Sequence, residues 1–528
     1  MASTAQDAPA RIWLHGPLLD ALFGCGGAYL LLLGLLVATG DSVRLAQPTL
    51  LFPLLTVLIS GPHYGATLLR VYERRADRRA YALFSVWASA AVLALFVASL
   101  WNVALGSFLV TLYLTWSPWH YTGQNYGIAV MFLRRAGAPL DAVTKRWLYA
   151  SFVSSFVFYA VVMHLDTGAG ASAPGAGPGF RAIGIPASLG DPAAVVAGLV
   201  YLVASAVAGR RLARGRSLGA LAPVALLSCS QMFWFVLPMA VRWSSASLGI
   251  DAFDSTLRNH YFIWIAAAHA TQYLWVTSFF ARRSGSDQMN TRWFLKALAS
   301  GSAIWMIPAL AFSPAMGGPL SMDAGLALLV ASAVNVHHFI LDGAIWKLRG
   351  RIADLLIRDV GADRAPAGGT LLRRAVWVAC GLAVAAQVFQ LVNVDRVRFA
   401  AELERRISAL DRLSWLGLDS AGHRFRFGSA YLRRGEGEAA VEQLERASAL
   451  SEAPRTWGAL GLARMKTGDS VGALEALDRA VALSPENPDF HRARANALRE
   501  LGRPAEAAAA LDRAAELAPR GPTRRVGP

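Results

Sequence analysis

Long apolar stretches separated by short polar segments fill the first three quarters of this 528-residue chain. A stretch of about 20 apolar residues is long enough to cross a lipid bilayer as one α-helix. Eleven such stretches can be counted, at 18–40, 50–71, 81–101, 107–133, 147–164, 192–209, 219–241, 257–281, 293–314, 325–346 and 375–394. The pattern therefore predicts an all-α, polytopic transmembrane helix bundle over residues 1–395.

After residue 395 the apolar runs give way to Ala, Leu, Arg and Glu at helical spacing, and the sequence repeats itself. Gly435, Gly468 and Gly502 are 33 and 34 residues apart, and an alanine stands five residues after each of them. A period of this length indicates helical hairpins stacked one on another. We therefore expect a second, soluble domain of helical repeats at 396–528.

The spacing of these repeats resembles that of the tetratricopeptide repeat. Trp457, Leu460 and Gly461 stand near the start of one unit and Pro485 stands at its end. The resemblance implies about three repeats, at 421–520, which present a concave surface to a protein or peptide partner.

The composition supports a membrane protein and argues against a nucleic-acid partner. Hydrophobic residues make up 55% of the chain and charged residues only 16%. The formal net charge is +16, but the Lys and Arg residues gather in short clusters after every second apolar stretch. Such clusters mark the cytoplasmic side of a membrane. They predict a bacterial inner-membrane type of protein with a cytoplasmic N-terminus, and the odd number of spans then predicts an extracytoplasmic repeat domain.

Five histidines lie at similar depth inside the predicted spans: His63, His120, His269, His337 and His338. Counted back from the basic residue that closes each span, they lie roughly 10–21 Å from the cytoplasmic boundary, at about 1.5 Å per residue. A sixth, His260, lies further out on the same helix as His269. Ionisable groups at membrane depth are costly and by default mark a functional site.

Asp342 is the one carboxylate in the layer that holds the five histidines. Neutral imidazole is the commonest metal ligand, so we expect these five histidines and Asp342 to hold a metal ion. Several imidazoles with one carboxylate suit non-haem iron or another first-row metal. A haem between two of the histidines is the alternative, although the chain has no haem-attachment sequence.

Other polar residues share a helical face with these histidines, three or four positions away, or lie next to them. Candidates for supporting the ligands in a second layer are Thr67, Gln124 and Gln272. Candidates for lining a substrate pocket are Tyr64, Tyr121 and Tyr273. The sequence identifies no catalytic residue.

The histidine-bearing segments resemble those of the bacteriorhodopsin-related β-carotene oxygenase family. GPHYGA at 61–66 is similar to the Pro-His-Gly-Ala segment of that family, with Tyr64 inserted, and NVHHFILDGAIWK at 335–347 is similar to its late helix with His and Asp. The resemblance implies dioxygen chemistry on a lipid-soluble substrate. It also implies non-haem iron held by His63, His120, His269 and His337 or His338.

These observations favour a membrane-embedded, histidine-ligated metal oxidoreductase or oxygenase that acts on a lipid or isoprenoid-type substrate. A desaturase-like reaction belongs to the same class, although the compact histidine boxes of fatty-acid desaturases are absent from the chain. Two other functions stay open. One is a non-enzymatic membrane scaffold or assembly factor whose function lies in the repeats, and the other is a proton-coupled transporter that uses the histidines.

Overall fold

A computed structural model describes the chain at residues 12–39, 54–72, 81–137, 140–166, 177–214, 216–248, 255–283, 291–346 and 371–517. Within these ranges the regular structure is helical, apart from a single β-bridge between Leu165 and Ile185. The chain forms two compact units. The first contains most of residues 1–391, and the second contains 392–528 together with 171–178 and 309–328.

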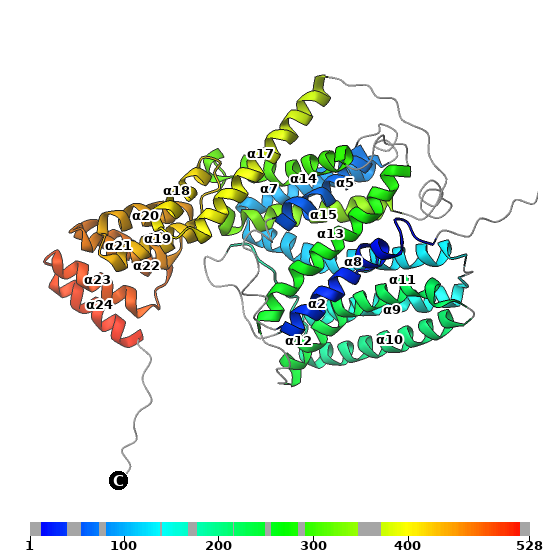
Figure 1. Ribbon diagram of the computed structural model, residues 1–528. Coiled ribbons are helices and arrows are strands. Elements are labelled where there is room, and N and C mark those ends of the chain that lie inside the picture. Colours follow the sequence, from blue (N-terminus) through cyan, green and yellow to red (C-terminus); the bar gives the residue numbers. More distant parts are fainter. Residues whose placement is uncertain are drawn as a thin grey trace, which may run out of the picture. The chain divides into compact units, whose positions relative to one another are not determined.

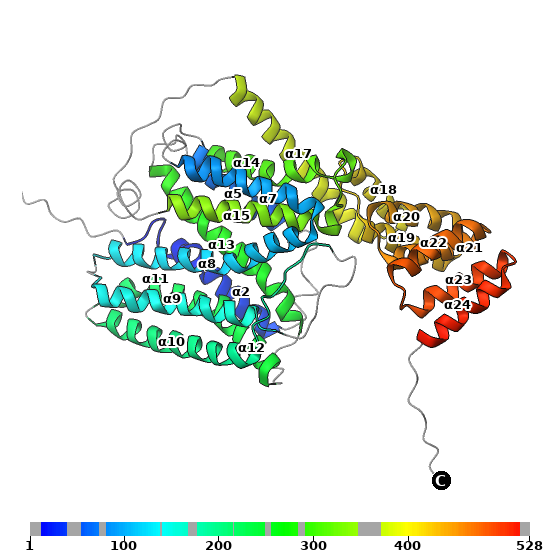
Figure 2. The same cartoon turned by 180° about the vertical axis from the view of Figure 1, so that it is seen from behind.

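The helices of the apolar part are long, and several contain a π-helical turn. They are α1 Pro17–Leu19, η1 Asp20–Gly24, α2 Gly27–Thr39, η2 Thr56–Ser60, α5 Gly61–Tyr72, η3 Leu83–Ala88, α7 Ser89–Trp101, α8 Val103–Arg135, α9 Ala142–Met163, α10 Ala187–Ala213, α11 Leu218–Gln231, η4 Met232–Val236, α12 Leu237–Leu248, α13 Ser255–Arg283, α14 Thr291–Ala311, α15 Ala327–Ile345 and α17 Leu371–Phe399. Figure 1 shows them as a bundle, and Figure 2 shows its other side.

Seven of the described helices are long and apolar enough to cross a membrane, or eight if the bent pair Pro17–Gly24 and Gly27–Leu35 forms one span. These helices are compatible with a membrane protein, but eleven spans are not clearly present. The helices that hold His63, His120 and His269 are not among the seven. Imidazole, amide and hydroxyl side chains lower the mean hydropathy of α8 and α13, so a count of apolar stretches overstates how apolar they are.

Antiparallel pairing of α9 and α10 shows how the bundle is held at its ends. The two helices lie side by side in both views (Figures 1 and 2). Asp141 caps α9 by accepting the amide of Thr144, and the hydrogen bonds from Thr144 lower the pKa of the Asp141 carboxyl to about 2. Arg211 of α10 donates to the Thr144 hydroxyl at 2.9 Å and to Asp141 at 3.2 Å. The cap of one helix is therefore also its contact with the next.

The second unit consists of short antiparallel helix pairs. Its helices are α18 Leu403–Ser414, α19 Ala421–Arg434, α20 Gly437–Leu450, α21 Pro454–Lys466, α22 Ser470–Leu483, α23 Pro488–Glu500 and α24 Pro504–Leu517, with η5 Pro314–Met316 and η6 Met322–Leu326 from the loop that precedes α15. Gly435, Gly468 and Gly502 have φ of 83°, 81° and 70°. This left-handed conformation strongly favours glycine, which explains why glycine recurs at the turn inside each repeat.

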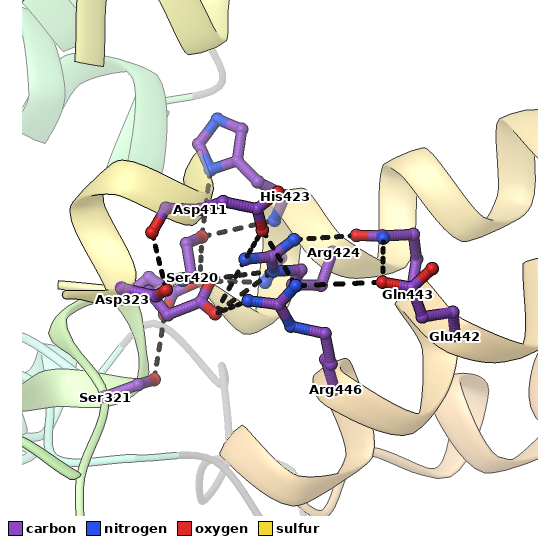
Figure 3. Close-up of polar contacts among 12 residues, drawn as sticks. Ser321, Asp323, Asp411, Ser420, His423, Arg424, Glu442, Gln443 and Arg446 are labelled. Atoms are coloured by element: carbon purple, nitrogen blue, oxygen red, sulfur yellow. Dashed lines mark hydrogen bonds and ion pairs between the residues drawn. The ribbon is translucent and has the colours of Figure 1, made fainter. Parts of the chain in front are cut away.

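The loop between α14 and α15 caps the first repeat helix from outside the repeats. Oδ2 of Asp323 accepts the backbone amide of Gly422 at 2.8 Å and the hydroxyl of Ser420 at 2.7 Å (Figure 3). Ser420 is itself the N-cap of α19 and accepts the amide of His423. A carboxylate in this position satisfies donors that have no partner within the helix, and the helix dipole favours its charge.

A buried arginine holds the first repeat together. The side chain of Arg424 is fully buried, and its guanidinium donates to Asp419, Asp411 and Gln443, each at 2.8 Å (Figure 3). Arg446 of α20 reaches the same Asp411 carboxylate at 2.8 Å. Because removing one partner of a buried ion pair leaves the other charge uncompensated, this network fixes α18, α19 and α20 in one arrangement.

Candidate metal centre

Four of the five predicted histidines meet in one cluster. They come from four helices: His63 from α5, His120 from α8, His269 from α13 and His338 from α15. The ring centre of His63 lies 5.0 Å from that of His269 and 4.3 Å from that of His338. The ring centre of His120 lies 5.0 Å from each of the same two rings. With metal–nitrogen distances of about 2.1 Å, imidazoles around a common ion have ring centres roughly 5 Å apart.

Two sets of potential ligands overlap in this cluster and share His338. One set is His63, His269 and His338, and the other is His120, His338 and Asp342. Within each set the ligand atoms lie within 4.8 Å of one another. Three of the histidines are 1–2% exposed, and the side chain of His120 is 10% exposed. Water is thereby excluded from all but one side of the cluster.

Hydrogen bonds around Asp342 run in one direction, toward its Oδ1 atom. The Tyr273 hydroxyl donates to this oxygen at 2.8 Å, and the Thr67 hydroxyl donates to it at 3.1 Å. Trp346 donates to the Tyr273 oxygen at 3.0 Å. The Thr67 oxygen lies 3.0 Å from Nδ1 of His338 and 2.6 Å from the Tyr273 hydroxyl oxygen. Donation from the Thr67 hydroxyl to Asp342 leaves its oxygen to accept from Nδ1 of His338, in the tautomer that carries the imidazole proton on that nitrogen.

The cluster then holds acceptor atoms facing one another. Nε2 of His338 lies 3.4 Å from Oδ2 of Asp342, and Nε2 of His120 lies 3.8 Å from the same oxygen. With its proton on Nδ1, His338 presents the lone pair of Nε2 to Oδ2 of Asp342, an arrangement that either a shared proton or a metal cation between the two atoms stabilises. Among the described residues, the buried Nε2 atoms of His63, His120, His269 and His338 have no hydrogen-bond partner. The residues present therefore fit a metal ion.

His337 lies outside the cluster, which corrects its place among the predicted ligands. Its Nε2 contacts the hydroxyl of Ser89 on α7 at 2.8 Å. Consecutive residues on an α-helix point about 100° apart, so only one of His337 and His338 can face a given point. His260 lies outside the residues whose side chains the structure describes.

The three residues predicted to support the ligands make hydrogen bonds across helices. Thr67 lies one turn after His63, but its hydroxyl contacts His338 and Asp342 of α15. The amide of Gln124 donates to Oε1 of Gln272 and to the backbone carbonyl of His269, and Gln272 donates to Asn125 and to the carbonyl of Gly24. These glutamines therefore fix helices α8 and α13 against each other, next to the imidazoles.

The three predicted pocket tyrosines have different roles. Tyr273 lies beside Asp342 and lines a cavity. Tyr121 stacks on the ring of His269, with ring centres 3.9 Å apart. Tyr64 packs against His63 and donates to Asn335 at 2.8 Å. Trp346, which was not among the predicted site residues, donates to Tyr273. Its position four residues after Asp342, which puts both side chains on one helical face, is the signal that could have identified it.

A cavity of about 340 Å³ opens beside the cluster. It is lined by residues of α8, α13 and α15, and His120, Tyr273 and Asp342 are among them. A ligand in this cavity would therefore touch the least buried histidine and the carboxylate.

The match to a known protein family lies in the C-terminal part of the chain. The family model described as tetratricopeptide repeat matches residues 425–488 and 459–522. Residues 425–522 are tetratricopeptide repeats. The repeats predicted from the sequence are thereby confirmed, and repeats of this kind support a protein-interaction role. The match does not include the helices that hold the histidines.

Two solved structures are similar to part of the chain. "Crystal structure of MamA protein" has 21% identity and a TM-score of 0.22, and the match covers 28% of this chain and 80% of that one. "MamA MSR-1 C2" has 22% identity and a TM-score of 0.21, with 28% and 87% covered. No curated protein matches the chain.

Proposed function

We propose that the apolar part of this protein binds a first-row transition metal and catalyses an oxidation or oxygenation of a lipid-soluble substrate. The ligands are His63, His120, His269, His338 and Asp342. The observation that carries the proposal is the carboxylate oxygen of Asp342 facing the imidazole nitrogens of His120 and His338 at 3.8 and 3.4 Å. Non-haem iron suits this set of ligands, and when bound it supplies dioxygen activation.

The residues of the chain itself prepare the site in three ways. Thr67 orients His338 so that its Nε2 lone pair faces the cluster, as a second layer of hydrogen bonds commonly does for metal ligands. Tyr273 and Thr67 both donate to Oδ1 of Asp342, which leaves Oδ2 for the cation. The buried faces of α5, α13 and α15 keep water away from three of the four histidines.

Metal analysis of the purified protein tests the proposal, with two neighbouring residues as a matched pair. The variant His338→Ala should retain less than about one tenth of the wild-type metal, since loss of even a supporting residue typically costs 10–100-fold in affinity. His337→Ala should retain wild-type metal, because His337 contacts Ser89 instead. Wild-type protein without iron, zinc, manganese or copper above trace would overturn the proposal.

An optical spectrum of the same sample separates haem from non-haem iron. Haem gives an intense Soret band, and we expect none. If metal is found, its stoichiometry decides whether the two overlapping sets of ligands hold one ion or two.

A second candidate function follows from the repeats. Residues 425–522 favour a membrane scaffold or assembly factor that docks a protein partner. In that case the histidines hold the bundle together, and His338→Ala would change its stability while no metal is present in the wild type.

The membrane topology belongs to the same proposal. We propose eleven spans with a cytoplasmic N-terminus, which puts the repeats outside the cytoplasm. The support is the alternation of basic and non-basic loops along the chain.

A further inference from the structure

Three glycines line the cavity that opens beside His120 and Asp342: Gly123 and Gly127 of α8 and Gly343 of α15. A Cβ atom added to any of them would meet no atom within 4 Å. None of the three has a positive φ. Neither close packing nor backbone conformation therefore requires glycine at these positions.

Glycine inside a helix is unfavourable by about 0.5–1 kcal/mol relative to alanine. Gly123 and Gly127 are four residues apart, so they lie on one face of α8 and their missing side chains leave a continuous groove. What these glycines do provide is open space in front of the cluster.

A buried polar side chain of the cluster also lines this groove. The His120 side chain lines the cavity and is nine-tenths buried, and its Nε2 has no hydrogen-bond partner among the described residues. The rest of the wall is largely aromatic or apolar, with Trp116, Trp119, Phe339 and Trp346. The groove is therefore an apolar channel that leads to the candidate metal centre.

The dimensions of the groove select the shape of its ligand. Its lining residues on α8 run from Trp116 to Met131, a distance of about 22 Å at 1.5 Å per residue. Its volume of about 340 Å³ is at the low end for small-molecule sites. A space this long and this small is narrow. It fits one extended chain better than a bulky, compact ring system.

We propose that this groove binds a single extended hydrocarbon chain, and that Gly123, Gly127 and Gly343 determine which chains enter. His120 lies about 6 Å from the Trp116 end and about 16 Å from the Met131 end, by the rise of the helix. The carbon beside His120 and Asp342 is therefore near one end of the bound chain, and the longer arm extends past Gly127. The reaction at this carbon rests on the proposed function, whereas binding of the chain does not.

Energy transfer to cis-parinaric acid, a fluorescent polyene fatty acid, tests the binding. Its emission should rise when the tryptophans beside the groove are excited, and saturate at one equivalent per protein. Gly127→Leu should weaken this binding by at least about tenfold. The substitution fills the groove and favours the helix, so folding is not at risk.

Gly209→Leu is the matched control. Gly209 is an exposed helical glycine of α10 with open space around it, and it does not line the groove. The Gly209→Leu variant should bind the probe as the wild type does. Equal binding by Gly127→Leu and the wild type would overturn the proposal.

Competition by fatty alcohols of increasing length gives a second readout. In the wild type, affinity should rise with chain length until the groove is full. In Gly127→Leu the rise should stop at shorter chains, because only about 10 Å of α8 separates residue 127 from His120. The same dependence on length in both proteins would contradict the proposed position of the chain.

Metal content is measured in the same samples. Gly127→Leu should keep the wild-type metal, because Gly127 is outside both sets of ligands. If Gly127→Leu weakens probe binding but neither the wild type nor the variants contain metal, the proposed groove is supported and the proposed oxidation is wrong. If metal is present but Gly127→Leu binds the probe as the wild type does, the proposed groove is wrong and the proposed metal centre is not affected.

Discussion

Thr67 shows how a single hydroxyl organises the candidate metal centre. Its oxygen lies 2.6 Å from the Tyr273 hydroxyl, 3.0 Å from Nδ1 of His338 and 3.1 Å from Oδ1 of Asp342. The side chain is almost fully buried, at 1% exposed. Valine has the same shape without the oxygen, so it isolates the contribution of these hydrogen bonds.

Thr67→Val should therefore weaken metal binding by about 10–100-fold, the usual cost of losing a residue that orients a ligand. Titration of the metal-free protein with Fe²⁺ or Zn²⁺ measures this. Thr277→Val makes the same change on α13, where the hydroxyl donates only to carbonyls of its own helix. It should bind metal as the wild type does, and equal affinities for all three proteins would show that Thr67 does not orient a ligand.

The sequence predicted which residues of the cluster share a depth but not which of them touch. Counting residues back from the basic end of each predicted span put His63, His120, His269 and His338 at similar depth. The rotation of each helix depends on packing with its neighbours. The choice between His337 and His338, and the contact of Thr67 with α15, were therefore not accessible from spacing along one helix.

At the scale of whole helices, those that hold the histidines were harder to predict from apolar composition than those around them. Apolar composition predicted the helices without buried histidines well, because their surfaces need no specific partner. It was a poorer guide to α8 and α13, whose buried amides and imidazoles pair across the bundle. The repeats were predicted more completely, because glycine at the turns and alanine at the helix contacts recur with a fixed period.

The cap on α19 gives a prediction for a single helix. Asp323→Ala removes the acceptor of the Gly422 amide and the Ser420 hydroxyl, which should cost about 1 kcal/mol. Amide hydrogen exchange in the first turn of α19 should then accelerate roughly fivefold. Asp489→Ala, at the exposed start of α23, should leave exchange in α19 unchanged. Unchanged exchange in Asp323→Ala would mean that Ser420 alone caps the helix.

For the whole molecule, the alternation of charge between loops predicts on which side of the membrane each end lies. Alkaline phosphatase fused after residue 528 should be active, because the enzyme folds only outside the cytoplasm. Fusion after Arg283, in a basic loop, should be inactive. Activity in the second fusion and none in the first would invert the proposed topology and put the repeats in the cytoplasm.

The carboxylate of Asp323, which caps α19 from outside the repeats, affects how partners of the repeats are sought. A bait that starts near residue 400 omits Asp323, so the Gly422 amide at the start of α19 loses its acceptor. Baits that keep residues 309–328, or the full chain in detergent, retain this cap on α19.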